Sequence, residues 1–235
     1  MFYNFKSLIP FVFFISLMAN ANQEVIVTDL KPNAPDFVEL DNKFNQEGIV
    51  KKIIRSESQL GKYYFIFVEK PIKKTIYSGT LTTTYGLNNE GRWGEIDYIE
   101  EDPTEIVVKN LRAYIMSAHP DGFVQIQKFQ DDGSDIYSPE FFYHDSFIED
   151  ADDDGNPEFY LTYFADSDGL DDKPLKVIVY DSNQKVGDSF LKAKATAFYP
   201  AGNEESIYRV RYDQFWMSLP NKVQLRANDI IMKYK

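Results

Sequence analysis

The chain has 235 residues, of which 37 are Asp or Glu and 25 are Lys or Arg, so its formal net charge at pH 7 is −12. This acidity disfavours nucleic acid and anionic membrane surfaces as partners, because both repel a protein of the same sign. The chain contains no cysteine, which excludes disulfides, zinc–thiolate sites and thiol catalysis.

The first 21 residues have the pattern of a secretory signal peptide. Lys6 supplies a positive charge, residues 8–18 form an apolar run, and the Ala-Asn-Ala segment at 19–21 has the small side chains of a cleavage site. The run is too short for a membrane-spanning helix, which needs about 20 apolar residues. We therefore expect residues 1–21 to be removed after export to the periplasm or the extracellular space. Residues 22–235 are then expected to form a single β-rich domain without a membrane span.

Most of the chain shows the alternation of apolar and polar residues that is typical of β-strands. The segments are rich in Val, Ile, Thr, Tyr and Phe, and turn residues separate several of them. This pattern predicts a mainly β fold (all-β to α+β), built as an antiparallel sandwich or open barrel. The predicted strands cover residues 23–30, 49–57, 63–69, 75–85, 93–99, 105–108, 123–129, 141–148, 159–164, 175–180, 191–199 and 206–212.

Between two of these strands lies the acidic segment Asp150-Ala151-Asp152-Asp153-Asp154-Gly155-Asn156-Pro157-Glu158. Carboxylates at alternate positions can converge on one hard cation, because the glycine permits the sharp turn that follows them. The sequence predicts a Ca²⁺ site whose ligands are the side chains of Asp150, Asp152, Asp154 and Glu158 and the main-chain carbonyl of Asn156. The alternative is a solvated acidic turn, which is the usual role of a run of charges.

The loop is not an EF-hand, because Leu161 stands where the EF-hand requires a bidentate Glu. Its predicted flanks are strands, and it resembles the β-loop-β calcium loops of FG-GAP and VCBS-type repeats. Those repeats occur in series and form propeller blades, whereas this chain carries a single copy, so we do not expect a propeller.

A second acidic segment follows the next predicted strand. Residues 131–172 contain fifteen acidic residues and no Lys or Arg, which predicts an acidic pole on the molecule. Within it, a second candidate group of ligands could form another cation site, complete the first one, or be an exposed acidic loop. This group consists of Asp166, Asp168, Asp171 and Asp172.

The last element is the clearest helix. Ser218 is a suitable cap and Pro220 suits the first turn. Five apolar or aromatic residues then recur at helical spacing and predict a face that packs on the sheet, namely Val223, Ala227, Ile230, Ile231 and Tyr234.

The segment from Phe147 to Tyr180 resembles the signature region of exported bacterial proteins that are loosely called surface polysaccharide biosynthesis proteins. In that group a DxDxDGxxE loop, a strand, an acidic turn and a strand containing Pro-Leu-Lys occur in the same order. The resemblance implies a role in the cell envelope or in surface glycans. It implies no reaction and no catalytic residue.

Three classes of function are compatible with these features. The first is an exported, non-catalytic calcium-binding domain that contacts a glycan or a basic envelope protein, and we favour it because no catalytic motif is evident. The second is a calcium-dependent carbohydrate-active enzyme, which would need two carboxylates facing each other in an aromatic-lined cleft. The third is an acidic periplasmic antagonist of a cationic toxin or enzyme, which the negative charge favours.

Overall fold

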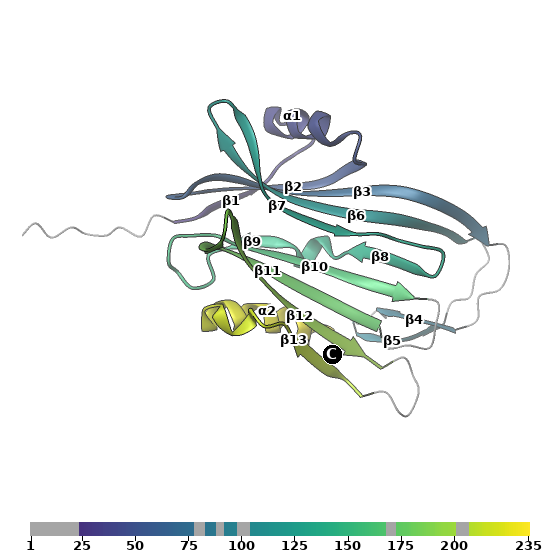
Figure 1. Cartoon of the computed structure of the whole chain (residues 1–235). Helices are drawn as coiled ribbons and strands as arrows, with labels where there is room; N and C mark the ends of the chain where they lie inside the picture. The colour runs from purple at the N-terminus through teal and green to yellow at the C-terminus, as the bar shows by residue number, and fades with distance from the viewer. Residues whose placement is uncertain (1–23, 78–82, 88–91, 98–103, 168–172, 201–206) are drawn as a thin grey trace, which may run out of the picture.

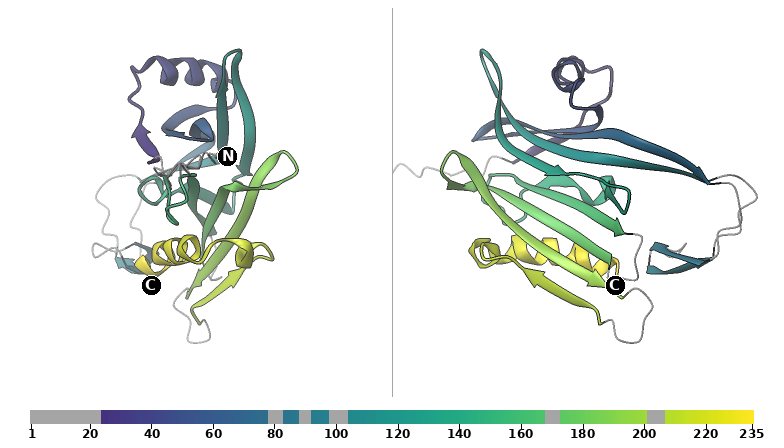
Figure 2. Two further views of the ribbon diagram at one scale, coloured as in Figure 1. Left: turned by 90° about the vertical axis from the view of Figure 1, so that its left-hand side faces the viewer. Right: turned by 45° about the vertical axis from the view of Figure 1, so that its right-hand side comes forward.

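The computed structural model describes residues 24–77, 83–87, 92–97, 104–167, 173–200 and 207–235. The predicted signal peptide, residues 1–21, lies outside these residues. The fold consists of two antiparallel sheets that face each other, with one α-helix on the outer face of each (Figure 1). The chain is therefore arranged in four layers, and Figure 2 shows the same order from two other directions.

The first sheet has five strands in the order β1-β2-β3-β6-β7. They span β1 (Ile26–Asp29), β2 (Ile49–Ser58), β3 (Gly61–Tyr77), β6 (Thr104–His119) and β7 (Gly122–Asp131). Between β3 and β6, β4 (Thr83–Leu87) and β5 (Trp93–Asp97) form a separate two-stranded hairpin.

The second sheet has the order β13-β12-β11-β10-β8, and the short strand β9 also pairs with β10. These strands span β8 (Tyr137–Phe141), β9 (Phe147–Glu149), β10 (Glu158–Ser167), β11 (Lys173–Val186), β12 (Ser189–Tyr199) and β13 (Arg209–Tyr212). Two 3-10 turns interrupt this half of the chain, η1 (Tyr143–Asp145) and η2 (Trp216–Ser218).

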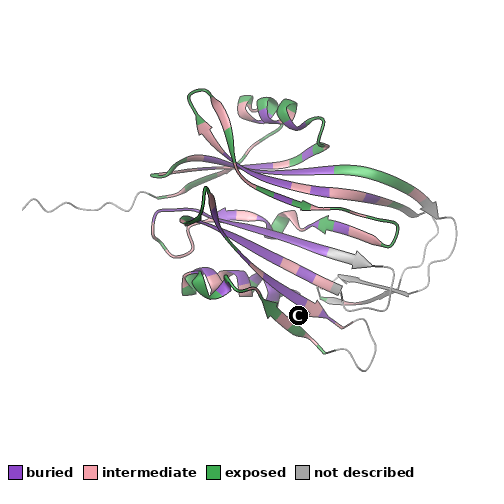
Figure 3. Ribbon diagram, viewed as in Figure 1, coloured by how far each residue is buried: buried purple, intermediate pink, exposed green. Residues whose placement is uncertain are grey.

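Aromatic side chains fill the space between the two sheets. Phe65 and Phe67 of β3 meet Phe159 of β10 and Phe141 of β8 with edge-to-face ring geometry, which is a favoured arrangement for aromatic pairs. The inner faces of β6, β7, β11 and β12 contribute to the same cluster. Burial is greatest along these central strands, as Figure 3 shows.

Each helix buries one apolar stripe on the outer face of a sheet. In α1 (Pro35–Phe44), Phe37, Leu40 and Phe44 pack on the first sheet. In α2 (Asn221–Lys233), the buried residues are Val223, Ala227, Ile230 and Ile231, and Tyr234 follows them. The predicted face of the last helix is thus confirmed.

The mainly β, antiparallel and open fold is also confirmed, but several local predictions were wrong. The helix α1 was not predicted. The prediction that Ser218 caps α2 was wrong, because Ser218 lies in η2 and the helix begins after Pro220 without a side-chain cap. In the part of the chain that the structure describes, no helix is long and apolar enough to cross a membrane.

Candidate metal centre

The loop from Asp150 to Glu158 joins β9 to β10, so a strand lies on each side of it as predicted, although η1 breaks the predicted flank 141–148. The two strands pair with Glu149 opposite Glu158, which brings the two ends of the acidic segment side by side. Gly155 has a φ of +84° and Asp153 a φ of +64°. Because the left-handed region favours glycine, Gly155 allows the chain to reverse as the sequence predicts.

Four predicted ligands converge inside this loop. One carboxylate oxygen from each of Asp150, Asp152, Asp154 and Glu158 lies within 4.8 Å of the others. Oxygens on opposite sides of a bound Ca²⁺, at about 2.4 Å from the ion, are about 4.8 Å apart. The four residues therefore form an acidic cluster with dimensions that a calcium ion fits.

Backbone amides hold three of these carboxylates in place, since Glu158 accepts a hydrogen bond from the backbone N of Ala151 at 2.8 Å. Asp150 accepts hydrogen bonds from the backbone N of Asp154 at 3.0 Å and of Gly155 at 2.9 Å. Asp154 accepts one from the backbone N of Asn156 at 2.8 Å. Each bond uses one lone pair of a carboxylate oxygen and leaves others for a cation.

The surroundings of the four carboxyls disfavour their ionised forms. Burial raises the pKa of the Glu158 carboxyl to about 9, and the neighbouring carboxylates of Asp152, Asp181 and Asp150 contribute to the shift. Burial, with repulsion from Asp154, also raises the pKa of Asp152. A cation bound among these groups would favour their ionised forms instead.

The basic side chains near the loop contact other acidic groups. Lys222 of α2 donates to the carboxylate of Asp153, and Arg226 donates to Glu149 at 2.6 Å. Among the residues that the structure describes, no Lys or Arg forms an ion pair with the four clustered acids. The two contacts join α2 to the outside of the loop and leave the charge inside it uncompensated.

Two buried oxygen atoms inside the turn have no hydrogen-bond partner. They are Oδ1 of Asp152 and Oδ1 of Asn156, and the Asn156 side chain belongs to a residue that is only 7% exposed. Unpaired buried oxygens are rare in proteins, because each loses its hydration without compensation. Their presence beside four carboxylates matches the oxygen-rich surroundings that Ca²⁺ requires.

Of the second candidate group, the structure describes one residue, Asp166. Asp166 is in β10 opposite Ser138 of β8, eight residues along the strand from Glu158, which corresponds to about 26 Å. The structure thus separates Asp166 from the loop cluster. Asp168, Asp171 and Asp172 lie outside the described residues.

The sequence analysis missed two residues that the fold brings to this site. Asp181 of β11 is directly opposite Glu158, and each residue is 1% exposed. Asn183 donates from Nδ2 to Asp154 at 2.6 Å. The sequence feature that could have revealed them is the Asp-Ser-Asn segment at residues 181–183, directly after the apolar part of β11. An antiparallel strand that follows β10 must end beside the start of β10.

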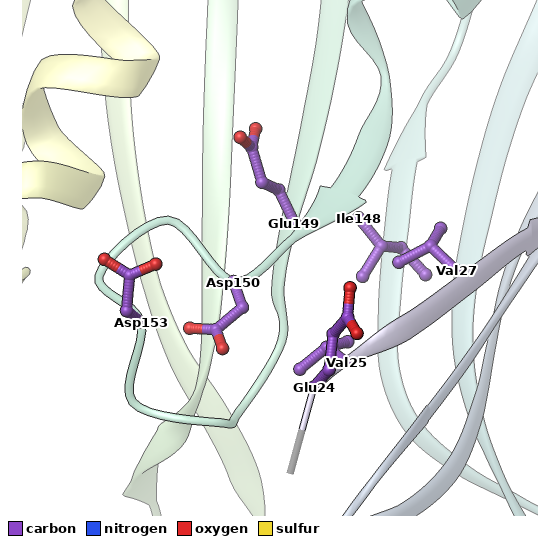
Figure 4. A pocket seen from close by; sticks show the side chains of 7 residues that line it. All are labelled: Glu24, Val25, Val27, Ile148, Glu149, Asp150 and Asp153. Atoms are coloured by element: carbon purple, nitrogen blue, oxygen red, sulfur yellow. The ribbon is translucent and has the colours of Figure 1, made fainter. Parts of the chain in front are cut away.

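A pocket of about 450 Å³ borders the loop on the side of the first sheet (Figure 4). It lies between the start of β1 and the β9–loop segment, so it spans the edges of both sheets. Its wall combines three aliphatic side chains with four carboxylates: Val25, Val27, Ile148, Glu24, Glu149, Asp150 and Asp153.

Comparison with protein-family models, with curated proteins and with solved structures finds no match to this chain. The likeness to a DxDxDxxxE loop therefore rests on the acidic cluster itself, in a β-rich fold that could hold a metal ion at this place.

Proposed function

We propose that the protein is an exported, non-catalytic calcium-binding β-domain that acts in the cell envelope, in contact with a surface glycan or a basic envelope protein. One observation carries the proposal, namely the convergence of four carboxylate oxygens within 4.8 Å in a loop whose basic neighbours bind elsewhere. The proposed ligands are Asp150, Asp152, Asp154 and Glu158, together with the main-chain carbonyl of Asn156.

Calcium would act here by making the loop rigid. The bound ion neutralises the buried carboxylate of Glu158, which is the first residue of β10, and thereby fixes the connection between β9 and β10. A rigid loop presents its exposed groups in one arrangement, which lowers the entropy that a partner must pay on binding. A glycan hydroxyl can also complete the coordination shell of the ion, because calcium takes six to eight oxygen ligands.

Export follows from the first 21 residues of the sequence. The basic residue, the apolar run and the small residues at 19–21 support cleavage before Asn22. Amino-terminal sequencing of the protein from a periplasmic or culture-fluid fraction should give Asn22 as the first residue. Recovery of the full-length chain in the cytosolic fraction alone would contradict export.

The pocket beside the loop favours a second candidate function. Three aliphatic side chains and four carboxylates line it (Figure 4), and two of these carboxylates, Glu149 and Asp153, already bind Arg226 and Lys222. The other two, with the aliphatic wall, fit a group that carries a cation on an apolar stem, such as a Lys side chain. This chemistry agrees with an antagonist of a cationic toxin or enzyme. The pocket has no aromatic lining, so nothing in it favours the carbohydrate-active enzyme.

A thermal melt tests the calcium site directly. The protein from Asn22 to Lys235 is heated until it unfolds, first in chelator and then in micromolar to millimolar calcium. Magnesium serves as the control. A ligand that binds only the folded state stabilises it by about 2.7 kcal/mol at a hundredfold excess over Kd. We expect a calcium-specific rise in Tm. An unchanged Tm would mean that the loop is an acidic turn and binds no calcium.

A further inference from the structure

Glu158 and Asp181 form a buried pair of like charges. They are directly opposite each other in the register of β10 and β11, so both side chains lie on the same face of the sheet. Each residue is 1% exposed. Like charges directly opposite each other destabilise a sheet, and burial removes the water that would screen them.

The groups that contact Asp181 do not neutralise its charge. Its carboxylate accepts hydrogen bonds from the backbone N of Asn183 at 2.9 Å and from Nε2 of Gln184 at 2.8 Å. Both donors are neutral, and among the described residues neither Asp181 nor Glu158 forms an ion pair with Lys or Arg. When both carboxyls are ionised, the pair needs a positive charge that the described side chains do not supply.

The segment after Asp181 is in direct contact with the acidic loop. The register of β11 and β12 shifts between Asp181 and Lys185, which places the three intervening residues outside the regular ladder. From this irregular segment, Asn183 donates to Asp154 at 2.6 Å, and Gln184 donates to the carbonyl of Ser218 at 3.0 Å. The segment thus connects the acidic loop to the chain that leads into α2.

A further observation points to a cation at the same place. The side chain of Asn156 is buried within the turn, and its Oδ1 accepts no hydrogen bond. Tyr160, two residues after Glu158 and on the same face of β10, is also fully buried with an unpartnered hydroxyl. Buried oxygens that lack donors thus belong to the turn and to the start of β10, and a bound cation with its water would satisfy them.

We propose that Asp181 supplies a fifth negative charge to the metal centre, next to the four carboxylates whose oxygens lie within 4.8 Å of one another, so that the centre joins the β9–β10 loop to β11. This inference rests on the proposed function, because it concerns the same ion. Five carboxylates around one site, of which Glu158 and Asp181 are buried, favour a large cation of high charge. The site should therefore bind a trivalent lanthanide more tightly than calcium and bind magnesium poorly.

The test compares the native protein with Asp181→Asn and with the control Asp121→Asn, which changes an exposed acid in the turn between β6 and β7. Calcium affinity is measured by titration calorimetry, and Tb³⁺ affinity by its luminescence under excitation of Tyr and Trp. We expect Asp181→Asn to weaken calcium binding at least tenfold, and Tb³⁺ binding by a larger factor. It should also raise the Tm in chelator, because it removes a buried carboxyl that pairs with no Lys or Arg among the described residues. Asp121→Asn should leave both affinities unchanged.

Three results would contradict the inference in different ways. If Asp181→Asn lowers Tm equally in chelator and in calcium with unchanged affinity, Asp181 serves only as the acceptor for Asn183 and Gln184. If the native protein binds neither calcium nor Tb³⁺, the proposed function itself fails. If Asp181→Asn does not fold, the ¹³C carboxyl resonance of Asp181 is followed in the native protein instead. A chemical shift that stays unchanged on calcium saturation would overturn the assignment of Asp181 to the metal centre.

Discussion

The hydroxyl of Tyr234, at the end of α2, donates a hydrogen bond to the carboxylate of Asp145 in η1. The same carboxylate accepts two hydrogen bonds from Nζ of Lys233, at 2.9 and 3.1 Å. Asp145 is buried, and its backbone carbonyl also accepts a hydrogen bond from Thr162 of β10. One acidic residue therefore fastens the carboxyl end of the last helix to the second sheet.

Removal of this hydroxyl should destabilise the protein more than removal of a hydroxyl bonded to a neutral group. Tyr234→Phe is expected to lower the free energy of unfolding by about 1.5 to 3 kcal/mol, since the acceptor is charged. Tyr199→Phe, in which the lost partner is the carbonyl of Ile231, should cost about 1 kcal/mol. Urea denaturation of both variants measures the difference, and an equal or larger loss for Tyr199→Phe would contradict this ranking.

Neutralising two loop carboxylates should have opposite effects with and without calcium. In chelator, Asp152→Asn with Asp154→Asn should raise Tm, because it relieves the repulsion among Asp150, Asp152 and Asp154. In calcium, the double variant should lose the stabilisation of about 2.7 kcal/mol that the native protein gains at a hundredfold excess over Kd. Differential scanning calorimetry with Asp121→Asn as the control makes the comparison. A double variant that keeps the calcium response would show that the ion binds elsewhere.

The stability of the metal-free protein should decrease as pH rises. The ordinary pKa of a Glu carboxyl is 4.5, and burial raises that of Glu158 to about 9. Between these values the folded state binds the proton and the unfolded state has lost it, so the free energy of unfolding falls with increasing pH. Calcium replaces the proton on this carboxylate and should remove the decline.

Melts in chelator at several values between pH 5 and pH 9, repeated in saturating calcium, measure this dependence. Glu158→Gln is the matched variant, because its amide has the same size and no titration. In chelator, the stability of this variant should fall less with rising pH than that of the native protein. Identical pH profiles for the two proteins would mean that Glu158 ionises normally in the folded state.

Two glycines separate the effect of a close contact from that of backbone strain. Gly48, before β2, has a φ of +150°, and a Cβ there would lie 2.5 Å from the backbone O of Glu69. Gly61, at the start of β3, has a φ of +117° with nothing within 4 Å of a Cβ. Gly48→Ala should therefore be about 1 to 3 kcal/mol more destabilising than Gly61→Ala. Chemical denaturation measures the free energy of unfolding of both variants. Equal losses of stability would show that only the backbone conformation matters.

Local pattern was sufficient to predict most of the strands, the acidic loop and the buried face of α2, although it missed residues 109–119 of β6 and almost all of β8. It failed where distant contacts determine the structure. The predicted strand 141–148 is broken by η1, and there Lys52 of β2 donates to the carbonyls of Tyr143 and Ser146. No local feature of the sequence indicates that a lysine ninety-one residues away stabilises this break.

The missed helix and the long strand have local explanations. In α1 only three residues are buried, Phe37, Leu40 and Phe44, and a stripe of three in a short segment is a weak periodic signal. Two predicted strands merged into β3, since the register shift between Pro71 and Lys73 lets the chain remain paired with β6 beyond the proline. For the candidate site, Asp181 was missed because its position depends on strand pairing.

Each of the two sheets is built from one continuous segment of the chain. Every strand of the first sheet precedes β8, and every strand of the second follows β7, so the chain passes between the sheets once, at residues 132–136 (Figure 1). Each half carries its own helix, and the aromatic side chains between the sheets join the halves. Two copies of the chain could therefore exchange halves by opening this one connection, and no strand would have to leave the middle of a sheet. A topology of this kind permits domain-swapped dimers.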